Sequence, residues 1–117
     1  SAKFWGFIRS ALRSAYNKWP PKWKVLHAAK REAIGKGKLK WEYQCKQCED
    51  WFPGSKVAVD HIHPVGSLTT YDDLAGFTLR LFCSEDELQV LCDICHAGKT
   101  KEENRVRREA KNEQQDS

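Results

Sequence analysis

The most informative stretch of the chain is Leu88-Gln-Val-Leu-Cys-Asp-Ile-Cys-His96. Its first part, Leu88–Cys92, is a short apolar run compatible with a buried strand. A helix is expected from Asp93 onward, because residues 99–111 contain neither proline nor glycine and are rich in helix formers. The stretch therefore predicts a strand followed by a helix, with two cysteines and a histidine at the junction.

The cysteines of this junction have a counterpart earlier in the chain. Cys45-x-x-Cys48 and Cys92-x-x-Cys95 share a two-residue spacing that lets both thiolates of a pair face one ion. Two such turns complete the tetrahedral shell of a structural Zn²⁺, which would fasten the region around Cys45 to the final helix. Two disulfides or four reduced thiols are the alternatives, although a cytosolic chain keeps its thiols reduced. The fifth cysteine, Cys83, is expected to be a small buried apolar residue.

A second cluster of polar residues lies at the end of another predicted strand. Residues 56–62 alternate in polarity as a half-buried strand does, and Pro64 ends the pattern. Asp60 and His61 belong to this strand, and His96 directly follows the second cysteine pair. If zinc joins the two pairs, it also brings His96 toward Asp60 and His61. A carboxylate and an imidazole can bind a divalent cation, and a neutral imidazole can take a proton from water near pH 7.

Two helices are expected before the first cysteine pair. Apolar residues recur at steps of three and four over residues 3–18, and Pro20-Pro21 stops this helix. A second helix is expected from Pro21 to Ile34, closed by the glycines that follow.

Four smaller features complete the expected elements. Residues 41–44 are expected to form a short strand. Asp72 or Asp73 is expected to cap a short helix that runs through Leu81. The segment Ser84-Glu-Asp-Glu87 fits a capping box, and residues 113–117 are expected to be a disordered tail.

The net charge of +4 conceals a strong partition along the chain. Residues 1–40 carry a net charge of +10, residues 41–96 carry −7 and residues 97–117 carry +1. A basic arm beside an acidic middle suits a nucleic-acid enzyme with a cation site, because bases neutralise phosphates while acids collect metal. The alternative is a solvated helix surface. The residues expected to contact DNA are Lys22, Lys24, Lys30 and Arg31.

Length and composition exclude several classes of protein. The chain has 117 residues, enough for one domain but not for two independent cores. No apolar run approaches the roughly 18 residues of a membrane span, and the first residues lack the apolar segment of a secretion signal. We therefore expect a soluble, cytoplasmic protein without membrane partners.

In these motifs the sequence resembles the HNH endonucleases of the ββα-metal fold, particularly the small zinc-stabilised proteins of bacteriophages and prophages. The resemblance covers about residues 20–105, and its specificity lies in the ordered combination of segments. The segments are Pro20-Pro-Lys-Trp23, Cys45-x-x-Cys48, Val59-Asp-His-Ile-His-Pro64 and Leu88-Gln-Val-Leu-Cys-Asp-Ile-Cys-His-Ala-Gly-Lys-Thr100.

The resemblance implies an α+β fold. Residues 40–112 would form a ββα-metal nuclease core, on which a basic helical arm of residues 1–39 would pack. The implied activity is metal-dependent hydrolysis of DNA phosphodiester bonds to 5′-phosphate and 3′-hydroxyl products.

The resemblance also assigns roles to the residues of the motifs. His61 would be the general base, and Asp60 and His96 would hold a catalytic Mg²⁺, Mn²⁺ or other divalent transition metal ion. The four paired cysteines would hold Zn²⁺. A phage protein of this kind would act in a bacterial host cell, in genome packaging beside terminase and portal proteins, in homing or in restriction.

Three residues near this cluster have open roles. Glu87 replaces the middle Asn of the family name, and an ionised carboxylate cannot donate hydrogen bonds as an amide does. Glu87 therefore either leaves the loop to be braced differently or becomes an extra metal ligand. Lys99 either contacts a phosphate or is a surface residue that aids solubility. His63 either touches substrate or metal or hydrogen-bonds near Pro64.

Glu87 and the basic first 40 residues also fit a second hypothesis, a noncatalytic zinc-bound module for DNA binding or phage packaging. Such a module would bind DNA in a salt-sensitive way and would not cleave it when divalent metal is added. No second domain large enough to recognise a long site is evident, so a nuclease of this kind is expected to have weak sequence preference.

Overall fold

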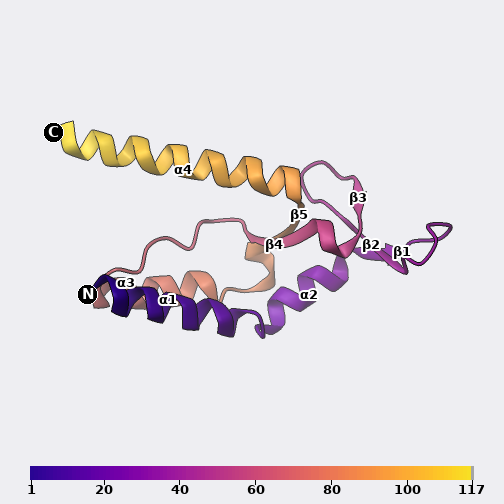
Figure 1. Ribbon diagram of the computed structural model, residues 1–117, viewed down its shortest axis with the longest axis horizontal. Coiled ribbons are helices and arrows are strands. Elements are labelled where there is room, and N and C mark those ends of the chain that lie inside the picture. The colour runs from indigo at the N-terminus through magenta and orange to yellow at the C-terminus, as the bar shows by residue number, and fades with distance from the viewer. Residues whose placement is uncertain (117) are drawn as a thin grey trace.

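The computed structural model describes residues 1–116 and has an α+β fold. In this part of the chain, four α-helices combine with two small antiparallel sheets. The molecule is elongated, 57 × 30 × 24 Å, and α4 extends well beyond the sheets (Figure 1). The elements are α1 (Ala2–Tyr16), α2 (Pro20–Ala28), β1 (Lys30–Glu32), β2 (Trp41–Gln44), β3 (Trp51–Phe52), β4 (Val57–His61), α3 (Tyr71–Leu81), β5 (Leu88–Cys92) and α4 (Asp93–Asp116).

The helices α1 and α3 lie side by side and contribute to the main apolar core (Figure 1). Trp5 and Tyr16 of α1 pack in one cluster with Phe77 and Leu81 of α3. Cys83 is buried in the same cluster, so its expected role as a small packing residue is confirmed. The basic first helix therefore also stabilises the fold, since its apolar stripe is removed from water.

The second helix is shorter than expected. It begins at Pro20, where the fixed φ of proline suits a first helical turn, but it ends at Ala28 rather than at Ile34. Lys30–Glu32 forms strand β1, which pairs antiparallel with β2. The prediction of one helix through Ile34 is wrong because cross-strand pairing outweighs a weak local helical pattern. The boundary expected between residues 39 and 40 falls inside this hairpin.

A two-stranded antiparallel sheet, β4–β5, leads into α4. In its register Asp60 lies opposite Gln89 and Val57 lies opposite Cys92. The strand expected at Leu88–Cys92 and the helix expected after it are confirmed. Because β5 passes into α4 without a loop, the first turn of α4 is fixed relative to the sheet.

The capping of the short helices differs from the expected pattern. Thr70 is the N-cap of α3, and Asp73 completes a reciprocal capping box with it. Ser84 caps no α-helix, because residues 85–87 form a single 3₁₀ turn and the Ser84 hydroxyl hydrogen-bonds to the Asp86 carboxylate. The expected capping box at Ser84 is therefore not formed, since the chain enters β5 directly after this turn.

The final helix is longer than expected. It continues to Asp116, so residues 113–116, expected to be disordered, are helical; Ser117 lies outside the described residues. The helix can continue because no proline or glycine follows Gly98. Neither α4 nor any other helix within residues 1–116 is both long and apolar enough to cross a membrane.

The β1–β2 hairpin contains a buried carboxylate that makes the stability pH-dependent. Glu42 is only 3% exposed, and hydrogen bonds from Lys36 and Arg31 lower the pKa of its carboxyl below the usual 4.5. The charged form therefore stabilises the folded state above pH 4.5, and this stabilisation is lost as the pH falls through the lowered pKa. We expect Glu42→Gln to decrease the urea midpoint at pH 7, and we expect its difference from wild type to vanish at acidic pH.

Glu32→Gln is the matched control for this experiment, because Glu32 is exposed on the neighbouring strand β1. Its urea midpoint should follow that of the wild type at every pH. A Glu42→Gln difference that is the same at pH 7 and at strongly acidic pH would contradict the stabilising role of the carboxylate.

Candidate functional site

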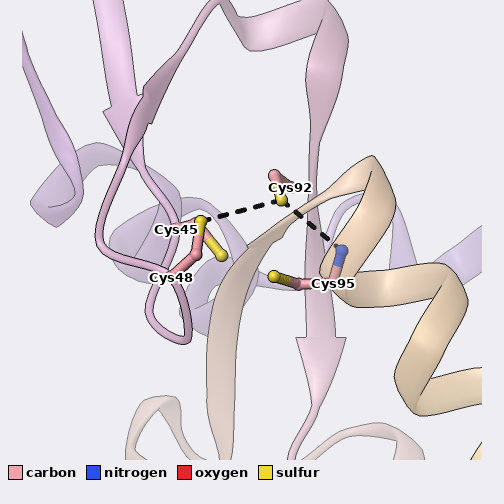
Figure 2. Close-up of side chains that lie close together, drawn as sticks. All are labelled: Cys45, Cys48, Cys92 and Cys95. Atoms are coloured by element: carbon pink, nitrogen blue, oxygen red, sulfur yellow. Dashed lines mark hydrogen bonds between the residues drawn. The ribbon is translucent and has the colours of Figure 1, made fainter.

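The four cysteines of the two pairs come together in the structure, and their sulfur atoms face a common centre (Figure 2). All four sulfur atoms lie within 4.8 Å of one another, and those of Cys48 and Cys92 are 4.0 Å apart. A tetrahedron of sulfurs about 2.3 Å from an ion has edges of about 3.8 Å. The spacing and the donor set therefore fit a metal ion such as zinc. The four residues are Cys45 and Cys48 after β2, Cys92 at the end of β5 and Cys95 in the first turn of α4.

The environment of the thiols favours metal binding. Burial raises the pKa of the Cys45 thiol, but hydrogen bonds from the backbone N–H groups of Cys48, Cys92 and Gln47 outweigh burial and lower this pKa to about 6. The pKa of the Cys95 thiol is instead raised to about 12, chiefly by its interaction with Cys92. Four thiolates this close repel one another, so all four can be charged only around a cation.

The cysteine centre joins elements that are far apart in the chain. The Lys46 N–H donates to the Val90 carbonyl at 2.8 Å, and the Gln44 N–H donates to the Ala29 carbonyl at 2.9 Å. The segment around the first cysteine pair is thereby tied to β5 and to the end of α2. An ion at the centre would fix α4, the helix that carries His96, against this segment.

Asp60 of β4 and His96 of α4 face each other. The Asp60 Oδ1 atom lies 3.6 Å from the His96 Nε2 atom. Two ligands at right angles around an ion of the size of Mg²⁺, each about 2.1 Å from it, are about 3 Å apart. The pair is thus close to the spacing that a shared cation requires. Asp60 is 8% exposed and the His96 side chain 42%, so an ion would enter from the His96 side.

The second oxygen of the Asp60 carboxylate has protein partners. The Gln89 Nε2 atom donates to Oδ2 at 3.0 Å, and the Lys99 Nζ atom lies 3.2 Å from it. Lys99 also donates to the His61 carbonyl at 2.9 Å and to the Glu103 carboxylate at 2.7 Å. Although burial lowers the pKa of Lys99, its bonds to Glu103 and Asp60 raise it above 10.5 overall. Lys99 is therefore a charged brace between α4 and β4, and the Asp60 Oδ1 atom remains directed toward His96.

His61 is oriented by groups outside β4. Its Nε2 atom lies 2.9 Å from the Leu81 carbonyl, and because a carbonyl only accepts, this nitrogen carries the proton. In neutral His61 the Nδ1 atom is then the free acceptor. The Tyr16 ring packs edge-on against the imidazole, with 4.9 Å between centroids. Burial, with smaller contributions from Cys83 and Asp60, raises the pKa of Tyr16 to about 12, so this phenol is neutral at physiological pH.

Asp60, His61 and His96 line one cleft of about 430 Å³. Arg13 of α1 and Arg107 of α4 line the same cleft. A second, more open depression of about 820 Å³ runs along α4 and shares His96 and Arg107 with the cleft. The cleft therefore combines candidate metal ligands with positive charge suited to a phosphate.

Two residues with open roles lie outside the cleft. The Glu87 carboxylate is exposed and lies 3.5 Å from the Ser84 hydroxyl, while the Glu87 backbone carbonyl accepts a hydrogen bond from the Ile62 N–H at 3.0 Å. The end of β4 is thus braced by the main chain of Glu87. His63 is exposed on the following loop and does not line the cleft.

The four basic residues expected to contact DNA lie on two different elements. Lys22 donates to the Asn17 side chain at 3.0 Å, and Lys24 is exposed further along α2. Lys30 and Arg31 lie on β1, where each packs against a tryptophan ring. The expectation that all four share one helix is therefore wrong, because the chain leaves the helix after Ala28.

Among the groups of the site that were missed from the sequence are Gln89, the Leu81 carbonyl, Arg13 and Arg107. Gln89 had a usable signal, because it lies opposite Asp60 once the two strands pair as a hairpin. Leu81 acts through its backbone, which no side-chain pattern reveals. The two arginines reach the cleft only through the packing of α1 and the length of α4.

Comparison of the chain with protein-family models, with curated proteins and with solved structures gives no match.

Proposed function

We propose that the protein is a metal-dependent endonuclease of the HNH type that hydrolyses DNA phosphodiester bonds. Asp60 and His96 would hold the catalytic Mg²⁺, Mn²⁺ or related divalent ion, and the four paired cysteines would hold a structural Zn²⁺. The observation that carries the proposal is the 3.6 Å approach of Asp60 to His96 in the cleft that also contains His61. Metal-assisted phosphodiester hydrolysis can use this combination of ligands with a nearby base.

In this mechanism His61 is the general base. The Leu81 carbonyl holds its Nε2–H, so Nδ1 takes the proton from the water that attacks phosphorus. The bond from phosphorus to O3′ breaks and O3′ takes a proton from solvent water, which yields a 5′-phosphate and a 3′-hydroxyl. The divalent ion, when bound, offsets the negative charge that develops on the phosphate oxygens. Gln89 and Lys99 hold the Asp60 Oδ2 atom, which leaves Oδ1 for the ion.

Positive charge around the cleft supports DNA as the substrate. Arg13 and Arg107 line the cleft itself, and the adjoining surface of α4 adds Lys101 and Arg108. Such cations neutralise phosphates but do not read bases, so the proposed nuclease has weak sequence preference.

A noncatalytic DNA-binding module is the second candidate. The observation that favours it is the ion pair between Lys99 and Asp60, because an ammonium group 3.2 Å from the carboxylate competes with a divalent ion there. The basic surface would still attract DNA, and the cysteines would still hold zinc. The two candidates differ in whether Asp60 and His96 hold a divalent ion and in whether bound DNA is cleaved.

A plasmid assay separates them. We expect the purified protein to nick or cut supercoiled plasmid when Mg²⁺ or Mn²⁺ is added and to leave it intact without added divalent ion. Agarose gels follow the conversion, and sequencing of the cut ends should show no dominant long site. Intact plasmid with every ion of a divalent panel, together with salt-sensitive binding in a gel shift, would support the noncatalytic module instead.

A further inference from the structure

The β1–β2 hairpin is a positively charged projection that the proposed catalytic mechanism does not use. We call residues 30–44 the lysine hairpin. It lies at the end of the molecule opposite the C-terminal end of α4 (Figure 1). Five of its residues are basic and two are acidic, and the buried acid Glu42 is already paired with Arg31 and Lys36. The hairpin therefore carries a net charge of +3, and Lys30, Lys38 and Lys40 lie outside the ion pairs of Glu42.

Aromatic rings hold two of these cations in place. The Lys30 Nζ atom lies 4.4 Å from the centroid of the Trp41 ring, and the Arg31 Cζ atom lies 3.7 Å from that of Trp51. Neighbouring residues of a strand point to opposite faces, so each face of the hairpin carries a cation beside an aromatic ring. A hairpin with a cation beside an aromatic ring on each face fits a groove that encloses it better than it fits a flat protein surface.

The tip of the hairpin presents an aliphatic side chain among lysines. Ile34 is 84% exposed. Gly35 and Gly37 adopt φ angles of 79° and 64°, a region that other residues rarely enter, so the turn depends on these glycines. Exposed aliphatic side chains flanked by cations are the groups that architectural proteins insert between base steps in the minor groove.

The base of the hairpin adjoins the cysteine centre, from which the helix that carries His96 also starts. Strand β2 ends at Gln44, directly before Cys45 of the cysteine centre. DNA held by the hairpin would therefore flank the bond that lies in the cleft.

We propose that the lysine hairpin binds duplex DNA beside the cleaved bond and bends it. Lys38 and Lys40 contact phosphates on either side of the minor groove, and Ile34 wedges between base pairs. This inference rests on the proposed DNA substrate but requires no cleavage, so it can be tested by binding alone.

The test measures binding of a short labelled duplex by fluorescence anisotropy across a range of salt concentrations. Each phosphate contact contributes about 0.9 to the slope of log affinity against log salt, so Lys38→Gln/Lys40→Gln is expected to reduce the slope by about 2. Lys3→Gln/Lys111→Gln is the matched control: it removes the same charge from exposed positions near the two chain termini, which lie at the other end of the molecule (Figure 1). This control should leave the slope unchanged.

Bending is measured by energy transfer between dyes at the two ends of the duplex. We expect wild-type protein to increase the transfer, and we expect Ile34→Ser to abolish the increase while keeping the wild-type salt slope. Far-UV circular dichroism and zinc content show whether each variant is folded. An unchanged slope in the lysine variant, or undiminished transfer with Ile34→Ser, would overturn the hairpin proposal and leave the nuclease proposal standing. Wild-type protein that binds no duplex would overturn both.

Discussion

His61→Ala is expected to slow metal-dependent plasmid cleavage by about 10²–10⁴-fold, the range that a positioned general base contributes. The substitution removes the free Nδ1 acceptor but leaves the approach of Asp60 to His96 intact. The rate is measured as loss of supercoiled plasmid under enzyme excess with saturating Mn²⁺. Zinc content should stay at the wild-type level, because the cysteine centre does not include His61.

His27→Ala is the matched control, since His27 is exposed on α2 and does not line the cleft. It should cleave at the wild-type rate. An unchanged rate in this control shows that a slower rate of His61→Ala does not come from variation between preparations. Because the His61 ring packs against Tyr16, the thermal midpoint of His61→Ala is measured alongside the rate. Equal cleavage by folded His61→Ala would reject its role as base.

The contacts of the His61 ring link the first helix to the same folded unit as the cleft. Tyr16 of α1 and the Leu81 carbonyl of α3 both contact the His61 imidazole. These helices pack together in the main core, so the orientation of the ring depends on elements outside β4, β5 and α4. A change in α1 can therefore alter the candidate site without touching Asp60 or His96.

The parts of the fold that were predictable from the sequence are those with a strong local signal. The cysteine spacing implied a common centre, and that centre implied that His96 approaches Asp60. The strand at Leu88–Cys92 and the helix after it were predictable because their patterns are local. Lys30–Glu32 was not, since its strand depends on pairing with β2, which lies beyond a long turn.

The residues of the candidate site were predictable from the sequence, but the groups that hold them in place were not. Asp60 and the two histidines are chemically conspicuous residue types in recognisable motifs. The role of Lys99 depends on tertiary structure, because its amine reaches both Asp60 and the His61 carbonyl only when α4 packs on β4. The contact that holds the end of β4 at Glu87 is likewise a backbone hydrogen bond, from the Ile62 N–H to the Glu87 carbonyl. The identity of the side chains does not indicate such a bond.

Cys92→Ser, or treatment of the protein with a metal chelator, is expected to have the largest effect on stability. Structural zinc sites contribute roughly 10–16 kcal/mol in small domains, which is as large as the whole stability of a typical domain, about 5–15 kcal/mol. Cys92 lies where β5 becomes α4, so losing the ion releases this junction from the segment after β2. We expect the variant to lack a cooperative urea transition at neutral pH.

Cys83→Ala is the matched control, because Cys83 is buried but lies in the apolar core rather than among the clustered sulfurs. It should retain one zinc per chain and lose only about 1 kcal/mol of stability, as a small core truncation does. Elemental analysis gives the zinc content, and circular dichroism during chelator titration shows whether unfolding follows metal release. Wild-type protein that keeps a cooperative transition after complete removal of its metal would contradict the argument, because the approach of His96 to Asp60 would then depend on packing alone.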